Sequence, residues 1–141
     1  VYVNDDERVS RYWHSGRHRR AKWYLGWMPP HSTFFVRRSV YLRYGSFNTN
    51  YRIAADCELM LRLVLKHKVQ VRYVPNILVR MSLGGASNRS ITNIFKANRE
   101  VLQAWRDNGL AFGFLVPFFK VAQKPLQYIR RPRYLPRGVK E

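Results

Sequence analysis

Residues 54–65 have the sequence AADCELMLRLVL, and we expect the rest of the chain to fold around them. Two small residues and two acids precede a run of strong helix formers. On a helix, Leu59 and Leu63 fall on one side and Met60 and Val64 on the next, so apolar groups cover much of the circumference. The stretch therefore predicts a central helix that is buried on more than one side.

The two acids of this stretch, Asp56 and Glu58, fall in the first turn of the predicted helix. Free backbone N–H groups and the helix dipole favour negative charge there, so both side chains are suited to capping. The other interpretation is that one carboxylate faces a cleft and acts as a base. The helix pattern by itself leaves both interpretations open.

The composition indicates one folded domain with an anionic partner. The chain has 141 residues, 46% of them hydrophobic, which is enough for a core and argues against disorder. Lysine and arginine number 26 against 8 acids, giving a net charge of +18, and no acid occurs between Glu7 and Asp56. Nucleic acid, an anionic membrane surface and phosphorylated small molecules all fit such a charge. The single cysteine, Cys57, excludes an internal disulfide framework and fits a reducing compartment.

Before the central helix, the pattern predicts short elements. Val1 to Asn4 and Arg8 to His14 alternate like the two strands of a hairpin, and the acids between them are interpreted as a polar turn. A basic cluster beginning at Arg17 is expected to lie on a short, solvated helix. Since the chain begins at Val1 and not at methionine, we expect it to be part of a longer protein.

A rigid Pro29-Pro30 pair then precedes His31, which is interpreted either as a structural residue or as a side chain held at the edge of a cleft. A short strand is expected over residues 32–36, with Phe34 and Phe35 in the core. Residues 38–44 predict a short helix that ends at Gly45.

After the central helix, residues 69–74 and 77–81 alternate and predict two strands joined at Pro75-Asn76. A small-residue loop follows at residues 83–88. A long helix is expected to begin at Asn88 or Ser90, to continue through Trp105, and to end at residues 107–109.

The C-terminal segment, residues 110–141, combines aromatic residues with lysines, arginines and four prolines. Aromatic and basic residues together are typical of a segment that lies on an anionic membrane surface. The alternative is a helix packed on its own domain, followed by a disordered basic end. No stretch reaches the roughly 18 apolar residues that a membrane span requires.

Four motifs in order resemble the C-terminal half of a bacterial family 2 glycosyltransferase of polysaccharide biosynthesis. They are PPHSTFFVRR at 29–38, YGSFN at 44–48, YRIAADCELMLR at 51–62 and GGAS at 84–87. The resemblance extends from about Val1 to Gln103 and is most specific from Met28 to Ser87.

The resemblance implies an α/β fold, the acceptor-side half of a GT-A domain over residues 1–109. We expect a few-stranded mixed sheet, a buried central helix and a helical C-terminal region. The implied activity is transfer of a sugar, with inversion, from a nucleotide diphosphate sugar to a saccharide or lipid-linked acceptor. It also implies a cytoplasmic protein, or one peripheral on the inner face of the plasma membrane.

The resemblance also implies roles for particular residues. Asp56 matches the base that deprotonates the acceptor hydroxyl, although the family often has Glu where this chain has Ala55. His31 matches a position near the donor diphosphate and metal. Gly84, Gly85 and Ser87 match a loop near the active site.

The chain departs from the family pattern because the nucleotide-binding half and its Asp-x-Asp motif are absent from the 141 residues. Asp5-Asp6 lies downstream of that motif's place and is not assigned to it. A divalent cation, Mg²⁺ or Mn²⁺, is therefore expected in the complete enzyme, and no cofactor is assigned to this chain alone. The alternative function is a basic module that binds nucleic acid or an anionic membrane, although no nucleic-acid-binding motif is present.

Overall fold

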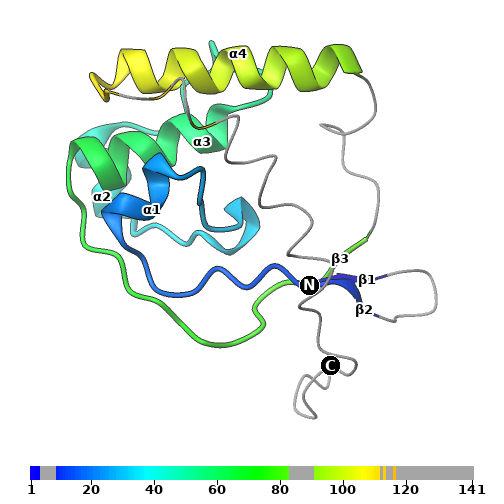
Figure 1. Cartoon of the computed structure of the whole chain (residues 1–141). Coiled ribbons are helices and arrows are strands. Elements are labelled where there is room, and N and C mark those ends of the chain that lie inside the picture. The colour runs from blue at the N-terminus through cyan, green and yellow to red at the C-terminus, as the bar shows by residue number, and fades with distance from the viewer. Residues whose placement is uncertain (4–8, 83–90, 112, 114–115, 117–141) are drawn as a thin grey trace.

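The structure is a computed structural model, and it describes residues 1–3, 9–82, 91–111, 113 and 116. Within these residues the chain is a mixed α/β structure with four helices and a small sheet of three strands. The helices gather in the upper part of Figure 1 and the strands in the lower part. The expected α/β class is thereby confirmed.

The sheet has the strand order β2-β1-β3 and is mixed, as expected. Strand β1, Tyr2–Val3, pairs antiparallel with β2, Val9–Arg11, and this confirms the predicted hairpin. On its other side β1 pairs parallel with β3, Met81–Ser82, which follows the central helix in sequence. The predicted turn between β1 and β2 lies outside the described residues.

Three of the predicted strands do not form as expected. Over residues 69–80 the backbone forms no strand, and only Met81–Ser82 reaches the sheet. An alternating pattern predicts that a segment can form a strand, but a strand also needs a neighbouring strand with which to pair. Because β1 has two residues, it offers few backbone groups for this pairing. Val69 and Val71 instead pack against the core as irregular chain.

The third strand prediction, over residues 32–36, was also wrong. The chain there forms a 3₁₀ helix, η1, His31–Thr33. The backbone N–H of Thr33 and its hydroxyl both bond to the carbonyl of Pro30, at 3.0 and 2.9 Å, and this tight turn replaces the extended chain. Phe34 packs against the core as expected, but Phe35 is 79% exposed, so its predicted burial was also wrong.

The helix predictions agree with the structure. Helix α1 is Arg20–Tyr24 and begins in the basic cluster. Helix α2 is Arg38–Tyr44 and ends at Gly45, whose φ of 84° favours glycine. Helix α4 is Ile91–Asp107, and the positive φ of Gly109 follows its end. The predicted capping residues of α4, Asn88 and Ser90, lie outside the described residues.

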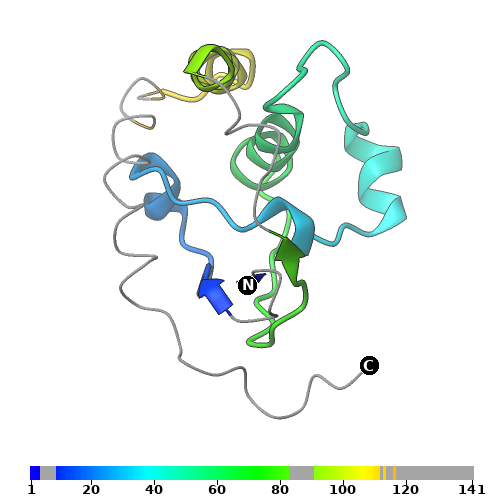
Figure 2. The same cartoon turned by 90° about the vertical axis from the view of Figure 1, so that its right-hand side faces the viewer.

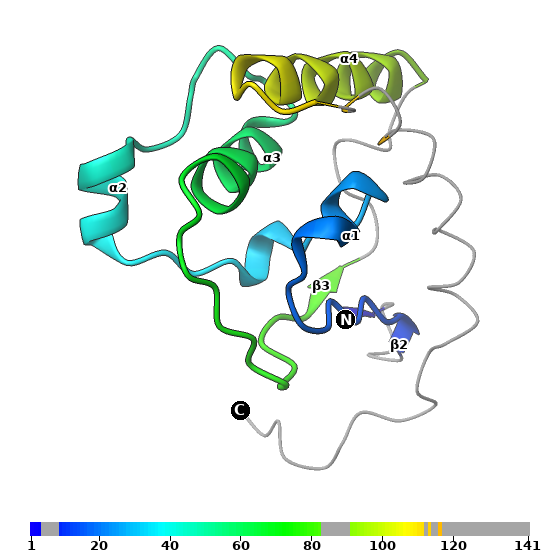
Figure 3. The ribbon, with the colours of Figure 1, turned by 60° about the vertical axis from the view of Figure 1, so that its left-hand side comes forward.

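The central helix comprises α3, Ala55–Met60, and a π-helical continuation, η2, Leu61–Lys66. Figures 2 and 3 show it between α1, α2 and α4. Its side chains are buried around the circumference, as the apolar pattern predicts. The buried residues of this helix are Cys57, Glu58, Leu59, Met60, Leu61, Leu63, Val64 and Leu65.

The neighbouring helices complete the core with aromatic side chains. Trp105 and Ala104 of α4 and Trp23 of α1 are all buried in the same cluster as the central helix. The rings of Tyr24 and Trp105 meet edge to face, with centroids 5.1 Å apart. Among the described helices, none combines the length and apolar character needed to cross a membrane.

Candidate functional site

The structure brings together two side chains that the sequence motifs select, His31 and Asp56. The Nδ1 atom of His31 lies 3.2 Å from Oδ2 of Asp56, and the two side chains are 51% and 30% exposed. The Asp56 carboxylate is thus held by a contact within the protein and is still partly exposed to solvent. It is therefore accessible to a molecule that approaches from outside.

A short element of local structure positions each of the two residues, His31 and Asp56. His31 opens η1, directly after Pro29 and Pro30, whose rings restrict the backbone. Asp56 lies in the first turn of α3, and its Oδ1 accepts the backbone N–H of Cys57 at 2.7 Å. One carboxylate oxygen is thus anchored to the helix, while the other faces His31.

The segment just before α3 is held by a residue from another helix. Glu100 of α4 accepts hydrogen bonds from the backbone N–H groups of Arg52, Ile53 and Ala54, at 3.3, 2.8 and 2.8 Å. These bonds satisfy three N–H groups just before the helix, whereas a capping side chain binds N–H groups of the first helical turn. The Asp56 carboxylate is therefore not needed for these three donors.

The electrostatics of Glu100 follow from these contacts. Burial raises the pKa of the carboxyl, but the three backbone N–H groups and the charge of Arg52 outweigh burial, so its pKa lies below its ordinary value. Glu100 is thus an ionised acceptor for these three N–H groups at neutral pH.

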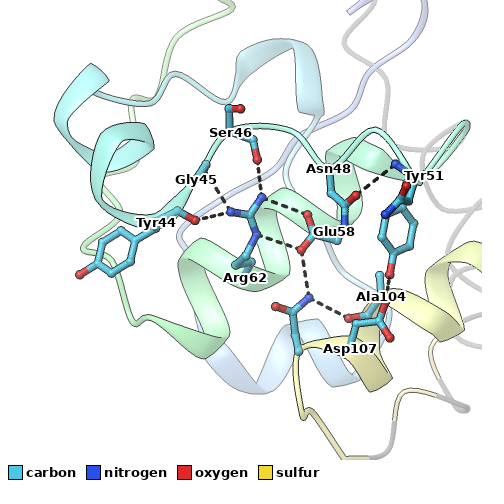
Figure 4. Close-up of polar contacts among 11 residues, drawn as sticks. Tyr44, Gly45, Ser46, Asn48, Tyr51, Glu58, Arg62, Ala104 and Asp107 are labelled. Atoms are coloured by element: carbon cyan, nitrogen blue, oxygen red, sulfur yellow. Dashed lines mark hydrogen bonds and ion pairs between the residues drawn. The ribbon is translucent and has the colours of Figure 1, made fainter.

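Glu58, the second acid of the predicted first turn, is a structural residue. It is buried, and its two oxygens face Nε and Nη2 of Arg62 at 2.9 and 3.1 Å, one helical turn further on. Asn108 donates to the same carboxylate at 3.3 Å. Figure 4 shows that Arg62 also donates to the backbone carbonyls of Tyr44, Gly45 and Ser46.

This network ties α3 to the end of α2 and to the end of α4. A buried ion pair is tolerated when hydrogen bonds satisfy the remaining donors and acceptors, as they do here. A second link lies nearby, where the hydroxyl of Tyr51 donates to Asp107, which also accepts from Gln103 at 2.6 Å. Both links fix the orientation of the helix that carries Asp56.

A cavity of about 740 Å³ lies beside the His31 segment. Pro30 and Ser32, the neighbours of His31, line it, together with Trp23 and Trp27 and residues of the 69–79 segment. His31 and Asp56 are not among the lining residues. The pair therefore stands next to this cavity and not inside it.

The remaining predicted site residues, Gly84, Gly85 and Ser87, lie outside the described residues. Within the described part, no cluster of three or more His, Cys, Asp or Glu side chains could hold a metal ion. His31 and Asp56 alone supply fewer ligands than a divalent cation takes from a dedicated protein site. The described residues thus do not fit the expected cation by themselves.

Sequence reasoning missed Glu100 and assigned Glu58 without its partner. The spacing of Glu58 and Arg62 is the i, i+4 spacing of a helical ion pair, so this contact could have been predicted. Nothing local marks Glu100 as the acceptor of these bonds, because the N–H groups that it binds lie 46 to 48 residues away in sequence.

Comparison of the chain with protein-family models, curated proteins and solved structures gave no match.

Proposed function

We propose that this chain is the acceptor-side part of an inverting glycosyltransferase. It would move a sugar from a nucleotide diphosphate sugar to a saccharide or a lipid-linked acceptor. The observation that carries the proposal is the contact between Asp56 and His31, which joins the two residues that the glycosyltransferase-like motifs select independently. The GT-A assignment belongs to this proposal and rests on the order of those motifs.

In the proposed reaction, Asp56 acts as the general base. It accepts the proton of an acceptor hydroxyl as that oxygen forms a bond to the anomeric carbon of the donor sugar. The bond from this carbon to the diphosphate breaks, its electron pair leaves with the nucleoside diphosphate, and the configuration at the carbon inverts. A base has to lie within hydrogen-bond reach of the hydroxyl, which the 30% exposure of the Asp56 side chain permits.

Among the acids of α3, Asp56 suits this role better than Glu58. Glu58 is buried and bonded to Arg62 and Asn108, so a substrate could reach it only after that network opened. Asp56 keeps one oxygen beside a half-exposed histidine. We assign His31 the role of orienting this oxygen through its Nδ1–H group.

The remaining parts of the reaction are assigned to residues outside this chain. The nucleotide, its diphosphate and a divalent cation would bind mainly to a donor-side half. A cation would stabilise the charge that develops on the leaving diphosphate.

The test is sugar transfer by the complete protein that carries this chain, with nucleotide sugar and acceptor extract as substrates. Asp56→Asn is expected to lower transfer at least about 100-fold, since a positioned base contributes about 10²–10⁴ in rate. Donor binding, measured by calorimetry, is expected to stay within about twofold of wild type because a removed base acts on the reaction step. Arg99→Gln, an exposed change on α4 away from the proposed site, serves as the control.

Retained transfer by Asp56→Asn would overturn the assignment of the base. Absence of transfer by the wild-type protein with every nucleotide sugar would overturn the glycosyltransferase proposal itself.

A further inference from the structure

We propose that the outer face of helix α2 docks on an anionic lipid surface. The face consists of Arg38, Ser39, Leu42 and Arg43, with Phe47 just beyond the helix, and we call it the α2 face. This inference concerns the surface to which the protein binds in the cell, and it does not depend on the proposed sugar transfer.

The α2 face is defined by which side of the helix packs inward. Val40, Tyr41 and Tyr44 pack against the hydrophobic core, so the opposite side of this seven-residue helix faces solvent. Leu42 is 77% exposed there, and Phe47 is 53% exposed. The helix lies at the edge of the molecule in Figure 3, well separated from α4.

Cations flank the exposed leucine. With about 100° of rotation per residue, Leu42 lies between Arg38 and Arg43 around the helix. The chain has no acidic residue from Arg8 to Ala55, so no nearby acid in sequence offsets these charges. The four described acids all have other partners: His31 for Asp56, Arg62 for Glu58, backbone N–H groups for Glu100, and Tyr51 and Gln103 for Asp107.

An apolar centre with a cationic border fits a lipid surface better than a phosphate backbone alone. Leucine and phenylalanine side chains enter the boundary between head groups and acyl chains, while arginine stems extend so that their charges stay at the head groups. Surfaces that bind single-stranded nucleic acid stack successive bases on several aromatic rings, whereas the α2 face has a single ring, that of Phe47, and its most exposed apolar residue is a leucine. The chemistry therefore favours a membrane rich in anionic lipid.

The first experiment measures co-flotation of the full 141-residue chain with vesicles of phosphatidylcholine containing 30% phosphatidylglycerol. Each arginine near such a surface contributes about 1 kcal/mol, so Arg38→Gln with Arg43→Gln is expected to weaken binding about 30-fold. Leu42→Ser is expected to weaken it about tenfold through the lost apolar contact. Pure phosphatidylcholine vesicles should bind far less protein.

Helix α4 offers a matched control, because Phe95 is 78% exposed and Arg99 and Arg106 are exposed on the same helix. Phe95→Ser, and Arg99→Gln with Arg106→Gln, repeat the chemical changes at another surface. Little change in these variants, together with the losses at α2, supports the proposal. Equal losses at both helices would show a general charge effect and overturn it.

A fluorophore reports directly on the docking face. The native Cys57 is buried, so an environment-sensitive dye can be attached selectively to Leu42→Cys or, as control, to Phe95→Cys. Anionic vesicles are expected to shift the emission of the dye at position 42 to the blue and to leave position 95 nearly unchanged. No shift at position 42 would overturn the proposal, whether or not the rest of the chain binds vesicles.

The same labelled protein distinguishes a nucleic acid from a membrane. If a single-stranded oligonucleotide shifts the dye at position 42 and anionic vesicles do not, the α2 face binds nucleic acid and the lipid proposal is wrong. Circular dichroism and thermal melts of every variant verify that the overall fold is kept.

Discussion

The backbone N–H of Ala54 donates a hydrogen bond of 2.8 Å to the carboxylate of Glu100, although 46 residues separate the two. Ile53 donates to the same oxygen at 2.8 Å. The beginning of the central helix is therefore set by a side chain of α4. Asp56, two residues after Ala54, depends on this long-range contact for its place.

Removal of the Glu100 charge is expected to destabilise the fold. Glu100→Gln should lower the free energy of unfolding by about 1 kcal/mol, because a neutral amide oxygen accepts weaker hydrogen bonds than a carboxylate does. Urea denaturation followed by circular dichroism measures this difference. Arg99→Gln, a neighbouring exposed change on α4, is the control and should leave the transition within about 0.5 kcal/mol. An unchanged midpoint for Glu100→Gln would show that the charge of Glu100 contributes nothing to stability.

Acid should unfold the protein partly through Glu100 and Asp107. Burial opposes ionisation of Glu100, but its hydrogen bonds prevail, and the pKa falls below the ordinary 4.5. The hydrogen bonds from Tyr51 and Gln103 likewise lower the pKa of Asp107 from 3.8. A lowered folded pKa gives stability that is present above the ordinary pKa and lost as pH falls through the folded value.

We therefore expect the free energy of unfolding to fall when the pH drops below about 4.5, and to fall less steeply in Glu100→Gln. Urea titrations at pH 6, 4.5 and 3.5 measure both slopes. Equal slopes for the two proteins would contradict the role of Glu100 in acid unfolding.

A second pH effect is expected near neutrality from His18. Its Nδ1 accepts the indole N–H of Trp23 at 3.0 Å, which requires that this nitrogen carry no proton. Burial lowers the pKa of His18 from 6.5, and the charge of Arg20 lowers it further. Stability is then present above pH 6.5 and is lost as the pH falls through the folded pKa.

The test compares urea midpoints at pH 7.5 and pH 5.5. Wild type should be less stable at the lower pH, and His18→Asn should lose part of this difference because its amide oxygen accepts the bond without titrating. His67 also has a lowered pKa, from burial and from Lys66 and Arg62, so His67→Asn should remove a separate part. A pH dependence that is unchanged in His18→Asn would contradict the assignment.

A side chain at Gly45 is expected to destabilise the fold. Its φ is +84°, and an added Cβ would lie 2.9 Å from Nη1 of Arg62, within the network around Glu58. Gly45→Ala should therefore cost about 1–3 kcal/mol, from backbone strain and from displacement of the guanidinium.

Gly109→Ala isolates the contribution of backbone strain. Gly109 has a similar φ of +64°, but an added Cβ would meet nothing within 4 Å. Thermal melts of the two variants should show the larger loss for Gly45→Ala. Equal losses would mean that the contact with Arg62 adds nothing to the strain.

The parts of the fold that the sequence predicts are those with local causes. The helical period of residues 55–65 and the glycine after α2 act within a few residues, and both predictions were confirmed. The strands predicted at residues 69–74 and 77–81 did not form, except at Met81, because pairing depends on a partner strand that an alternating pattern does not specify. The predicted burial of Phe35 was wrong because the tight turn at Pro30 changes the direction of the chain just before this residue.

The same distinction between local and long-range causes applies to the candidate site. Motifs select His31 and Asp56 one by one, and only the folded chain shows that they touch. Glu58 was interpreted by its place in the helix, while its buried ion pair with Arg62 also needs carbonyl groups from the end of α2. Local sequence thus predicts which groups carry chemistry, and tertiary structure decides which of them remain accessible.

The internal engagement of the four described acids has a practical consequence for anyone who purifies this protein. With its described carboxylates held by internal partners and a calculated isoelectric point near 11.0, the chain should behave in solution as a polycation. It should elute late from a cation-exchange column and carry host nucleic acid through the early steps. A wash at about 1 M salt, where the screening length shrinks to about 3 Å, should strip that contaminant before any binding assay.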